Sequence, residues 1–173
     1  VQDMINSTVG STSNVQQFGA WAFSDTPVDP GNPRCGLLFG SVATGNGTSY
    51  TMSAYVKGVA GASFLMGMID AAAFGTFQGT ALFTSGGTWH RYAGPTYLEG
   101  TPGNWYPFIR RESPASAVGF HVDGLQVETG SVTTYIDGDQ DGCYWTGNPH
   151  ASPSTRSGTY RGGGSVVALA DLG

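Results

Sequence analysis

The chain has 173 residues, a length that suits a single domain with one hydrophobic core. It contains 28 glycines and 12% aromatic residues, but only 11% of its residues are charged. Long helices need strong helix formers on their exposed faces, whereas short strands joined by tight turns use glycine and aromatic residues, which are abundant here. The 39% of hydrophobic residues excludes a disordered chain, so the composition indicates an all-β protein.

The formal net charge of −5 and a single lysine, Lys57, exclude a basic face that would neutralise phosphates. We therefore expect neither nucleic acid nor an anionic membrane as a partner. No apolar run reaches the roughly 20 residues of a membrane span, and residues 1–10 lack the pattern of a signal peptide. Because the first residue is Val1 rather than Met, we expect an excised or processed fragment.

Alternation of apolar and polar residues is clearest at 50–57. We expect the apolar members of this alternation, and those of a similar one later in the chain, to face the core: Tyr50, Met52, Ala54, Val56, Phe120 and Val122. Further strands are expected, in chain order, at 15–23, 36–42, 62–69, 76–83, 89–93, 104–110 and 118–128. So many short strands without a helical stretch predict an antiparallel sandwich of two sheets.

The character of the sequence changes after Tyr135. Residues 137–164 are dense in Gly, Pro, Ser and Thr, and one more short strand is expected at 165–169. We divide the chain into a sandwich, 1–136, and a C-terminal arm, 137–173. Because the arm cannot form its own core but holds apolar residues such as Trp145, we expect it to pack on the sandwich or on a neighbouring chain. Its strand would pair with an open sheet edge.

The two cysteines, Cys35 and Cys143, lie far apart in sequence and follow no metal-binding spacing. They can form one disulfide or remain two buried thiols. We favour thiols, because buried cysteine is a common core residue in reducing compartments.

Four segments resemble a known family: 50–58 (YTMSAYVKG), 87–91 (GTWHR), 120–130 (FHVDGLQVETG) and 134–152 (TYIDGDQDGCYWTGNPHAS). In this order they resemble the carbohydrate-binding-module-like jelly rolls of bacteriophage minor tail proteins and other virion-surface proteins. The Gly-rich ending, 162–173, looks like the link into a further tail domain. The resemblance implies an antiparallel jelly-roll β-sandwich with a Gly/Pro-rich C-terminal arm.

Three carboxylates at alternate positions, Asp137, Asp139 and Asp141, match the first half of a calcium-binding loop. The twelfth position of such a loop is Asn148 here instead of Glu. The resembling family usually has Pro at the position of Asp141, although its carbohydrate-binding relatives often carry a structural calcium. We favour turn formation over calcium binding at this segment and expect no cofactor.

Sugar recognition needs flat aromatic rings that stack on a pyranose and polar groups that bind its hydroxyls. Two segments supply this mixture: Asn104, Trp105 and Tyr106 beside a turn, and Tyr144 with Trp145 in the arm. The alternative is that Trp105 packs between the sheets and Trp145 holds the arm on the sandwich. We favour this alternative for both tryptophans, and we expect Trp89 to fill the core.

We predict that the chain is not an enzyme. It has no nucleophile elbow or zinc-binding His-Glu-x-x-His motif, and its histidines, His90, His121 and His150, have unrelated flanks. Asp123 and Glu128 are a carboxylate pair of the kind that a glycosidase uses. We instead interpret Asp123-Gly124 as a turn or bulge and Glu128 as the outward end of its strand.

The resemblance implies a structural module of a virion tail that assembles with other virion subunits, forms homo-oligomers and attaches to the host surface, with weak binding of a host polysaccharide. The first alternative is a secreted, extracellular carbohydrate-binding module of a polysaccharide-degrading enzyme. The second is a capsid decoration protein. A sugar binder needs an exposed aromatic platform, whereas an assembly module needs apolar patches that neighbours bury.

Overall fold

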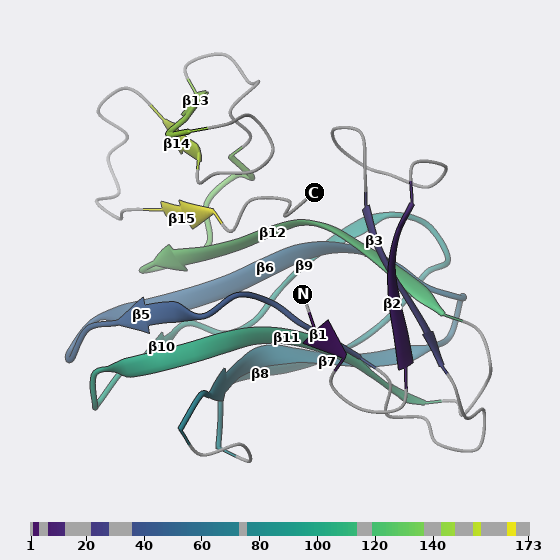
Figure 1. Ribbon diagram of the computed structural model, residues 1–173, viewed down its shortest axis with the longest axis horizontal. Helices are drawn as coiled ribbons and strands as arrows, with labels where there is room; N and C mark the ends of the chain where they lie inside the picture. Colours follow the sequence, from purple (N-terminus) through teal and green to yellow (C-terminus); the bar gives the residue numbers. More distant parts are fainter. Residues whose placement is uncertain are drawn as a thin grey trace.

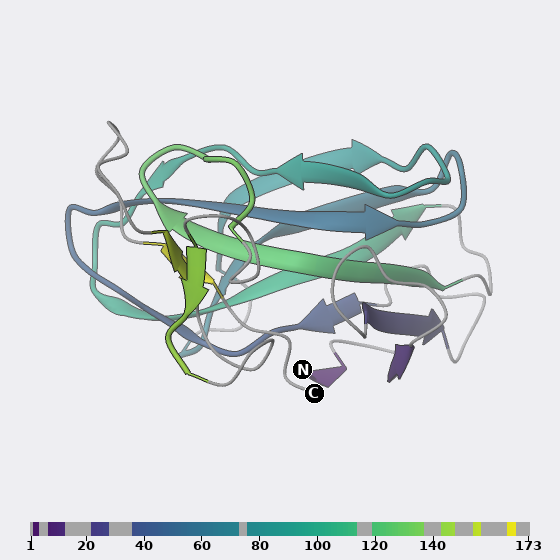
Figure 2. The ribbon, with the colours of Figure 1, turned by 90° about the horizontal axis from the view of Figure 1, so that it is seen from above.

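The computed structural model describes residues 2–3, 7–12, 22–27, 36–72, 76–113, 119–136, 143–147, 154–156 and 166–168. This part of the chain contains strands and turns and no helix. Two antiparallel sheets form a sandwich, and a small hairpin lies beside it (Figure 1, Figure 2). The predicted all-β jelly-roll sandwich is confirmed.

Sheet A contains, in spatial order, β1 (Gln2–Asp3), β4 (Gly36–Leu38), β11 (Gly103–Ser113), β7 (Ser63–Asp70) and β8 (Phe77–Thr84), and β5 (Val42–Thr44) pairs with the start of β11. Sheet B contains β10 (Tyr97–Leu98), β6 (Ser49–Lys57), β12 (Phe120–Thr129), β3 (Ala22–Pro27) and β2 (Ser7–Thr12), with β9 (His90–Ala93) on β6 and β15 (Val166–Ala168) on β12. The hairpin is β13 (Cys143–Trp145) with β14 (Ser154–Arg156). Consecutive strands lie in different sheets after β1, β3, β5, β6, β8, β10 and β11, as in a jelly roll.

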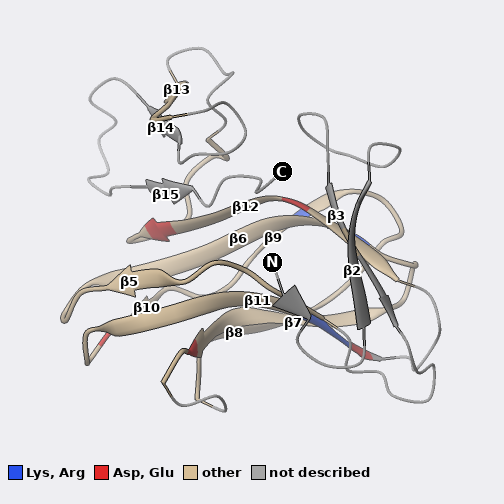
Figure 3. Cartoon of the chain, viewed as in Figure 1, with Lys and Arg blue, Asp and Glu red and all other residues tan. Residues whose placement is uncertain are grey.

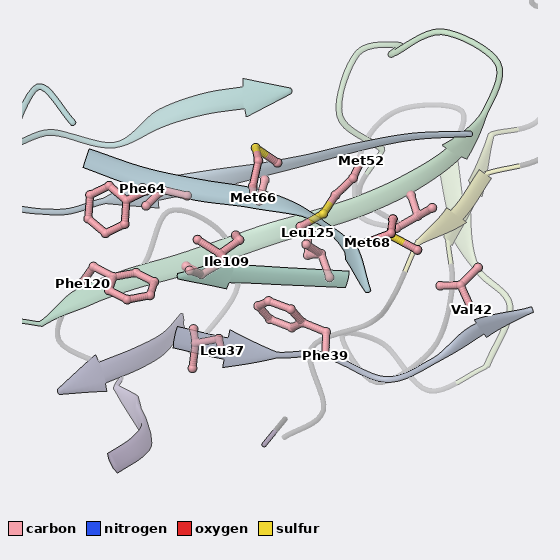
Figure 4. Packing of buried hydrophobic residues seen from close by; sticks show 14 of the residues in the cluster. Leu37, Phe39, Val42, Met52, Phe64, Met66, Met68, Ile109, Phe120 and Leu125 are labelled. Carbon is pink, nitrogen blue, oxygen red and sulfur yellow. The ribbon is translucent and has the colours of Figure 1, made fainter. Parts of the chain in front are cut away.

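The core lies between the two sheets and follows from the period of two along each strand. All six side chains that the sequence predicts in the core are buried, with exposed fractions from 0% to 7%. Phe64 of β7 meets Phe120 of β12 edge to face, with 5.0 Å between ring centroids. Met52 of β6 and Met66 and Met68 of β7 fill further space between the two sheets (Figure 4).

A bulge in β12 keeps its apolar residues in the core. The pairing register with β6 shifts between Asp123 and Gln126, and Gly124 takes a positive φ of 55° that other residues rarely adopt. Val122 before the bulge and Leu125 and Val127 after it therefore all face inward. The predicted bulge at Asp123-Gly124 is confirmed.

The prediction that Trp89 fills the core is wrong. Trp89 directly precedes β9, where Val56 of β6 pairs with His90. Val56 faces inward and shares its side of the sheet with His90. Trp89, one residue before His90, and Lys57, one residue after Val56, therefore point to the outer face. Trp89 is half-buried on the outer face of sheet B, 6.5 Å from the ring of His121 between centroids.

The expected strand at 165–169 is confirmed at Val166–Ala168, which pairs with Gln126–Glu128 of β12 in the same chain. Along the same edge of β12, β3 pairs with Phe120–Val122. The two strands therefore share one edge, and the C-terminal arm contributes to sheet B. The division of the chain at residue 136 stays a prediction.

Candidate functional site

Residues 104–106 divide between the two faces of sheet A. Trp105 pairs with Val42 and Asp70, points into the core and is 5% exposed. Its ring is thus not available to a sugar, and the structure supports the alternative that Trp105 packs between the sheets. Asn104 is exposed and Tyr106 half-buried, both on the outer face of sheet A.

Tyr106 belongs to a set of rings on that outer face. The strand register aligns Tyr106 of β11 with Ile69 of β7 and Phe77 of β8. Phe108, two residues along β11, meets Phe77 edge to face with 5.3 Å between ring centroids. Phe77 is 37% exposed, whereas Phe108 is fully buried beneath its neighbours. We call Phe77, Tyr106, Phe108 and Arg110 the aromatic face.

Arg110 adds hydrogen-bonding capacity to these rings. Its guanidinium carbon lies 5.4 Å from the ring centroid of Phe77 and 5.9 Å from that of Phe108, within the range of a cation–π contact. Its Nε donates to Oε1 of Glu112, which fixes the guanidinium beside the rings. Rings that offer a stacking surface therefore lie next to an ordered donor and a carboxylate, the chemistry that sugar recognition needs.

A glycine, which has no side chain, lies beside the rings of the aromatic face. Gly67 of β7 pairs with Phe108. A Cβ at this position would lie 2.9 Å from Cγ2 of Thr80 and 3.0 Å from the carbonyl oxygen of Gln78, so a side chain has no room there. Leu82, on the same face of β8, is exposed and stands in one row with Leu65 of β7 and Arg110 of β11.

Sequence reasoning missed Phe77, Phe108 and Arg110. The signal for two of them was present, because Tyr106, Phe108 and Arg110 occupy alternate positions of one strand and so share a face. Phe77 joins them only through the β7–β8 pairing, 29 residues before Tyr106 in sequence, which no local pattern reports.

The other aromatic segment lies elsewhere. Tyr144 of β13 is 53% exposed and Trp145 is half-buried. Their hairpin contacts the molecule through β14 and β15, on the side of sheet B (Figure 1). The structure thus brings Asn104 and Tyr106 to one face and leaves Tyr144 and Trp145 apart from it.

The outer face of sheet B is half covered by the chain itself. Residues 130–136, which we call the strap, follow β12 and fold back over it. Glu128, 1% exposed, accepts hydrogen bonds from the backbone N–H of Thr133 at 3.0–3.1 Å and pairs with Arg91 at 3.5 Å. Arg91 donates to Ser53 and to the carbonyl of Thr133, and the backbone N–H of Ile136 donates to Gln126.

These contacts give the carboxylates structural roles. The prediction that Glu128 lies at the outward end of its strand needs correction. Its side chain points to the outer face of sheet B, but the strap covers it, so the carboxylate is buried. Burial lowers the pKa of Arg91, and the neighbouring Glu128 opposes this shift. Asp123 accepts a hydrogen bond from the backbone N–H of Gly124 within the bulge.

The predicted metal ligands Asp137, Asp139 and Asp141 lie outside the described residues, as does Cys35. Cys143 in β13 is a free, half-buried thiol. Among the described residues no three His, Cys, Asp or Glu side chains gather as metal ligands would. The described segments also include no helix with the length and apolarity that a membrane crossing requires.

Solved structures share this architecture. The CBM22-1 xylan-binding domain of Paenibacillus barcinonensis Xyn10C superimposes with a TM-score of 0.52 at 16% identity, over 76% of this chain and 86% of that domain. The CBM6cm-2 module of Cellvibrio mixtus lichenase 5A, solved with cellotriose, gives 0.50 at 15% identity, over 76% and 91%. The fold is that of carbohydrate-binding modules.

A bacteriophage protein shares the fold as well. The enzymatically active domain of tailspike protein 4 of bacteriophage CBA120 matches with a TM-score of 0.51 at 11% identity, over 70% of this chain and 17% of that one. No protein-family model matches the chain, and no curated protein matches it in sequence. At these identities the likeness establishes the fold, and the function has to be argued from the site.

Proposed function

We propose that this chain is a non-catalytic carbohydrate-binding module whose aromatic face binds a polysaccharide. The observation that carries the proposal is the arrangement of Phe77 and Tyr106 beside the Arg110–Glu112 pair on the outer face of sheet A. The fold shared with modules described as binding xylan or holding cellotriose supports it. This was the first alternative of the sequence analysis, and the comparisons favour it over the virion role.

The chemistry of the face favours a neutral sugar chain. Its rings and the apolar side chains beneath them, Leu38 and Ile69, suit the apolar side of a pyranose. Arg110 is already neutralised by Glu112, so an anionic ligand would gain little from it. The remaining N–H donors of Arg110 and the Glu112 carboxylate would bind hydroxyl groups.

Catalysis is not part of the proposal. Glycoside hydrolysis needs two carboxyl groups that face each other across the scissile bond. Glu112 is paired with Arg110, whereas Glu99 and Glu128 are buried in other parts of the sandwich.

The test is binding of soluble xylan and of cello-oligosaccharides to the full chain, measured by isothermal titration calorimetry. We expect Tyr106→Ala to weaken binding about tenfold, because the loss of a stacked ring costs about 1.4 kcal/mol. Tyr144→Ala is the matched control, since it removes an exposed ring from β13. Equal losses in both variants, or no binding by the unchanged chain, would contradict the proposal.

A second candidate is the virion tail module, in which the same surface would attach to a host polysaccharide while the chain assembles with other virion subunits. The fold shared with a bacteriophage tailspike domain supports it. Light scattering after size-exclusion chromatography separates the candidates: a tail module forms homo-oligomers that Leu82→Lys would weaken if sheet A were the interface. A monomer at all concentrations favours a secreted module.

A further inference from the structure

Among the described residues, the strap covers only half of the outer face of sheet B. It lies over the half of β12 that follows the bulge, where Gln126 and Glu128 are buried. In the other half His121 of β12 pairs with Lys57 of β6, and the β6–β9 register places Trp89 on the far side of Lys57. Lys57 of β6, His121 of β12 and Trp89, which directly precedes β9, form one row, and all three are half-buried. We call this row the basic row.

Lys57 forms no ion pair with any of the side chains that the structure describes. The ion pairs found among these side chains are Arg91 with Glu128 and Arg110 with Glu112. Charged residues are few on both sheets, as Figure 3 shows. Asp123, the described carboxylate of β12 nearest in register to His121, uses one oxygen to bind the backbone N–H of Gly124. The only lysine of an acidic chain thus lies between Trp89 and His121 in strand register, with no ion-pair partner among the side chains that the structure describes.

His121 carries a second unused group. Its Nδ1 is buried and has no hydrogen-bond partner in the structure. Burial, with a smaller effect of Lys57, lowers the pKa of His121, so the imidazole is neutral at neutral pH. A neutral imidazole can donate at one nitrogen and accept at the other.

We propose that the basic row is a second binding site, separate from the aromatic face, that takes an acidic sugar such as a uronic acid residue of an anionic polysaccharide. The ammonium group of Lys57 pairs with the sugar carboxylate, the indole of Trp89 packs on the pyranose ring, and His121 binds a hydroxyl. A neutral sugar would leave Lys57 unpaired. Nucleic acid is excluded because a single lysine on a chain of net charge −5 cannot neutralise a phosphate backbone.

The competing explanation is structural: Trp89 and His121 would do no more than cover the aliphatic stem of Lys57. The two explanations differ in what they expect of Lys57→Gln, which removes the charge and keeps an uncharged polar side chain on a shorter stem. A structural row tolerates this change with no effect on any ligand, whereas a binding row loses its ligand.

The experiment titrates the full chain with oligogalacturonate at low ionic strength and follows binding by calorimetry. We expect Lys57→Gln and Trp89→Ala each to weaken binding at least about tenfold, and binding by the unchanged chain to weaken as salt is added. Lys57→Arg should retain most of the affinity. The ring resonances of His121 should shift on saturation, a readout that does not depend on any variant.

Two controls keep this outcome separate from that of the proposed function. Tyr106→Ala, on the opposite sheet, should leave oligogalacturonate binding unchanged, and Lys57→Gln should leave xylan binding unchanged. Arg110→Gln removes a cation from sheet A and should not affect oligogalacturonate. Absence of oligogalacturonate binding, or equal weakening by Lys57→Gln and Arg110→Gln, overturns the second site, whatever the xylan titration gives.

Discussion

The outer faces of the two sheets are built on different principles. The outer face of sheet A is paved with side chains of its own strands, Phe77, Tyr106 and Phe108, with one ion pair at its side. Half of the outer face of sheet B is instead covered by the strap, which is tied down by buried polar groups. Alternation along a strand shows which side chains point away from the core, but it cannot tell a surface that binds a ligand from one that the chain itself covers.

We expect the largest loss of stability from a substitution in the buried polar network beneath the strap. We expect Glu128→Ala to lower the free energy of unfolding by about 3 kcal/mol, because it leaves Arg91 half-buried without its partner and removes the acceptor of the Thr133 N–H. Urea denaturation measures the loss. Hydrogen exchange at the amides of Thr133 and Ile136 should accelerate as the strap loosens.

Glu112→Ala provides the comparison on sheet A. Its ion pair with Arg110 is partly exposed, and we expect a loss below about 1 kcal/mol. If the two variants lose equal stability, the difference that we draw between a strap-covered face and an open face is wrong.

Sequence reasoning recovered what depends on neighbours along the chain. The alternation at 50–57 predicted which side of β6 faces the core, and Asp123-Gly124 predicted the bulge at which the pairing register of β12 shifts. It failed where a residue's surroundings come from distant segments. The prediction for Trp89 was wrong because the direction of this side chain depends on the register of β9 against β6. The prediction for Glu128 was wrong because the strap folds back over this side chain and buries it.

Crowding at Gly67 should have the next largest effect. We expect Gly67→Val to destabilise the chain by about 2 kcal/mol, because its side chain would meet Thr80 and the carbonyl of Gln78 on β8. The substitution should also weaken xylan binding, since it adds a side chain beside the rings of the aromatic face. Gly40→Val is the control for stability, since a Cβ there meets nothing within 4 Å. An unchanged midpoint in thermal melts of Gly67→Val would contradict the close packing of β7 on β8.

The ion pair of sheet A should matter more for binding than for folding. We expect Arg110→Gln to weaken xylan binding about fivefold, because it removes a charged hydrogen-bond donor worth about 1 kcal/mol. Its effect on unfolding should stay below about 1 kcal/mol. Calorimetry and denaturation on the same sample separate the two effects. A variant that unfolds easily but binds normally would show that Arg110 serves the sheet and not a ligand.

The smallest effect that we predict is a dependence of stability on pH through His121. Burial and the nearby Lys57 lower its pKa in the folded chain below the ordinary value of 6.5. Between these two values the unfolded chain binds more protons than the folded one, so the free energy of unfolding falls as the pH drops below about 7 and levels off beneath the folded pKa. Melting temperatures at pH 7.5 and 5.5 should therefore differ more for the unchanged chain than for His121→Gln. His90→Gln, which alters an exposed ring, should leave that difference as it is. Since Lys57 contributes to the shift, Lys57→Gln should reduce the difference without removing it, because burial is the larger cause. An NMR titration in which His121 gains its proton at or above pH 6.5 would show that the uncovered half of sheet B is more open to water than its packing indicates.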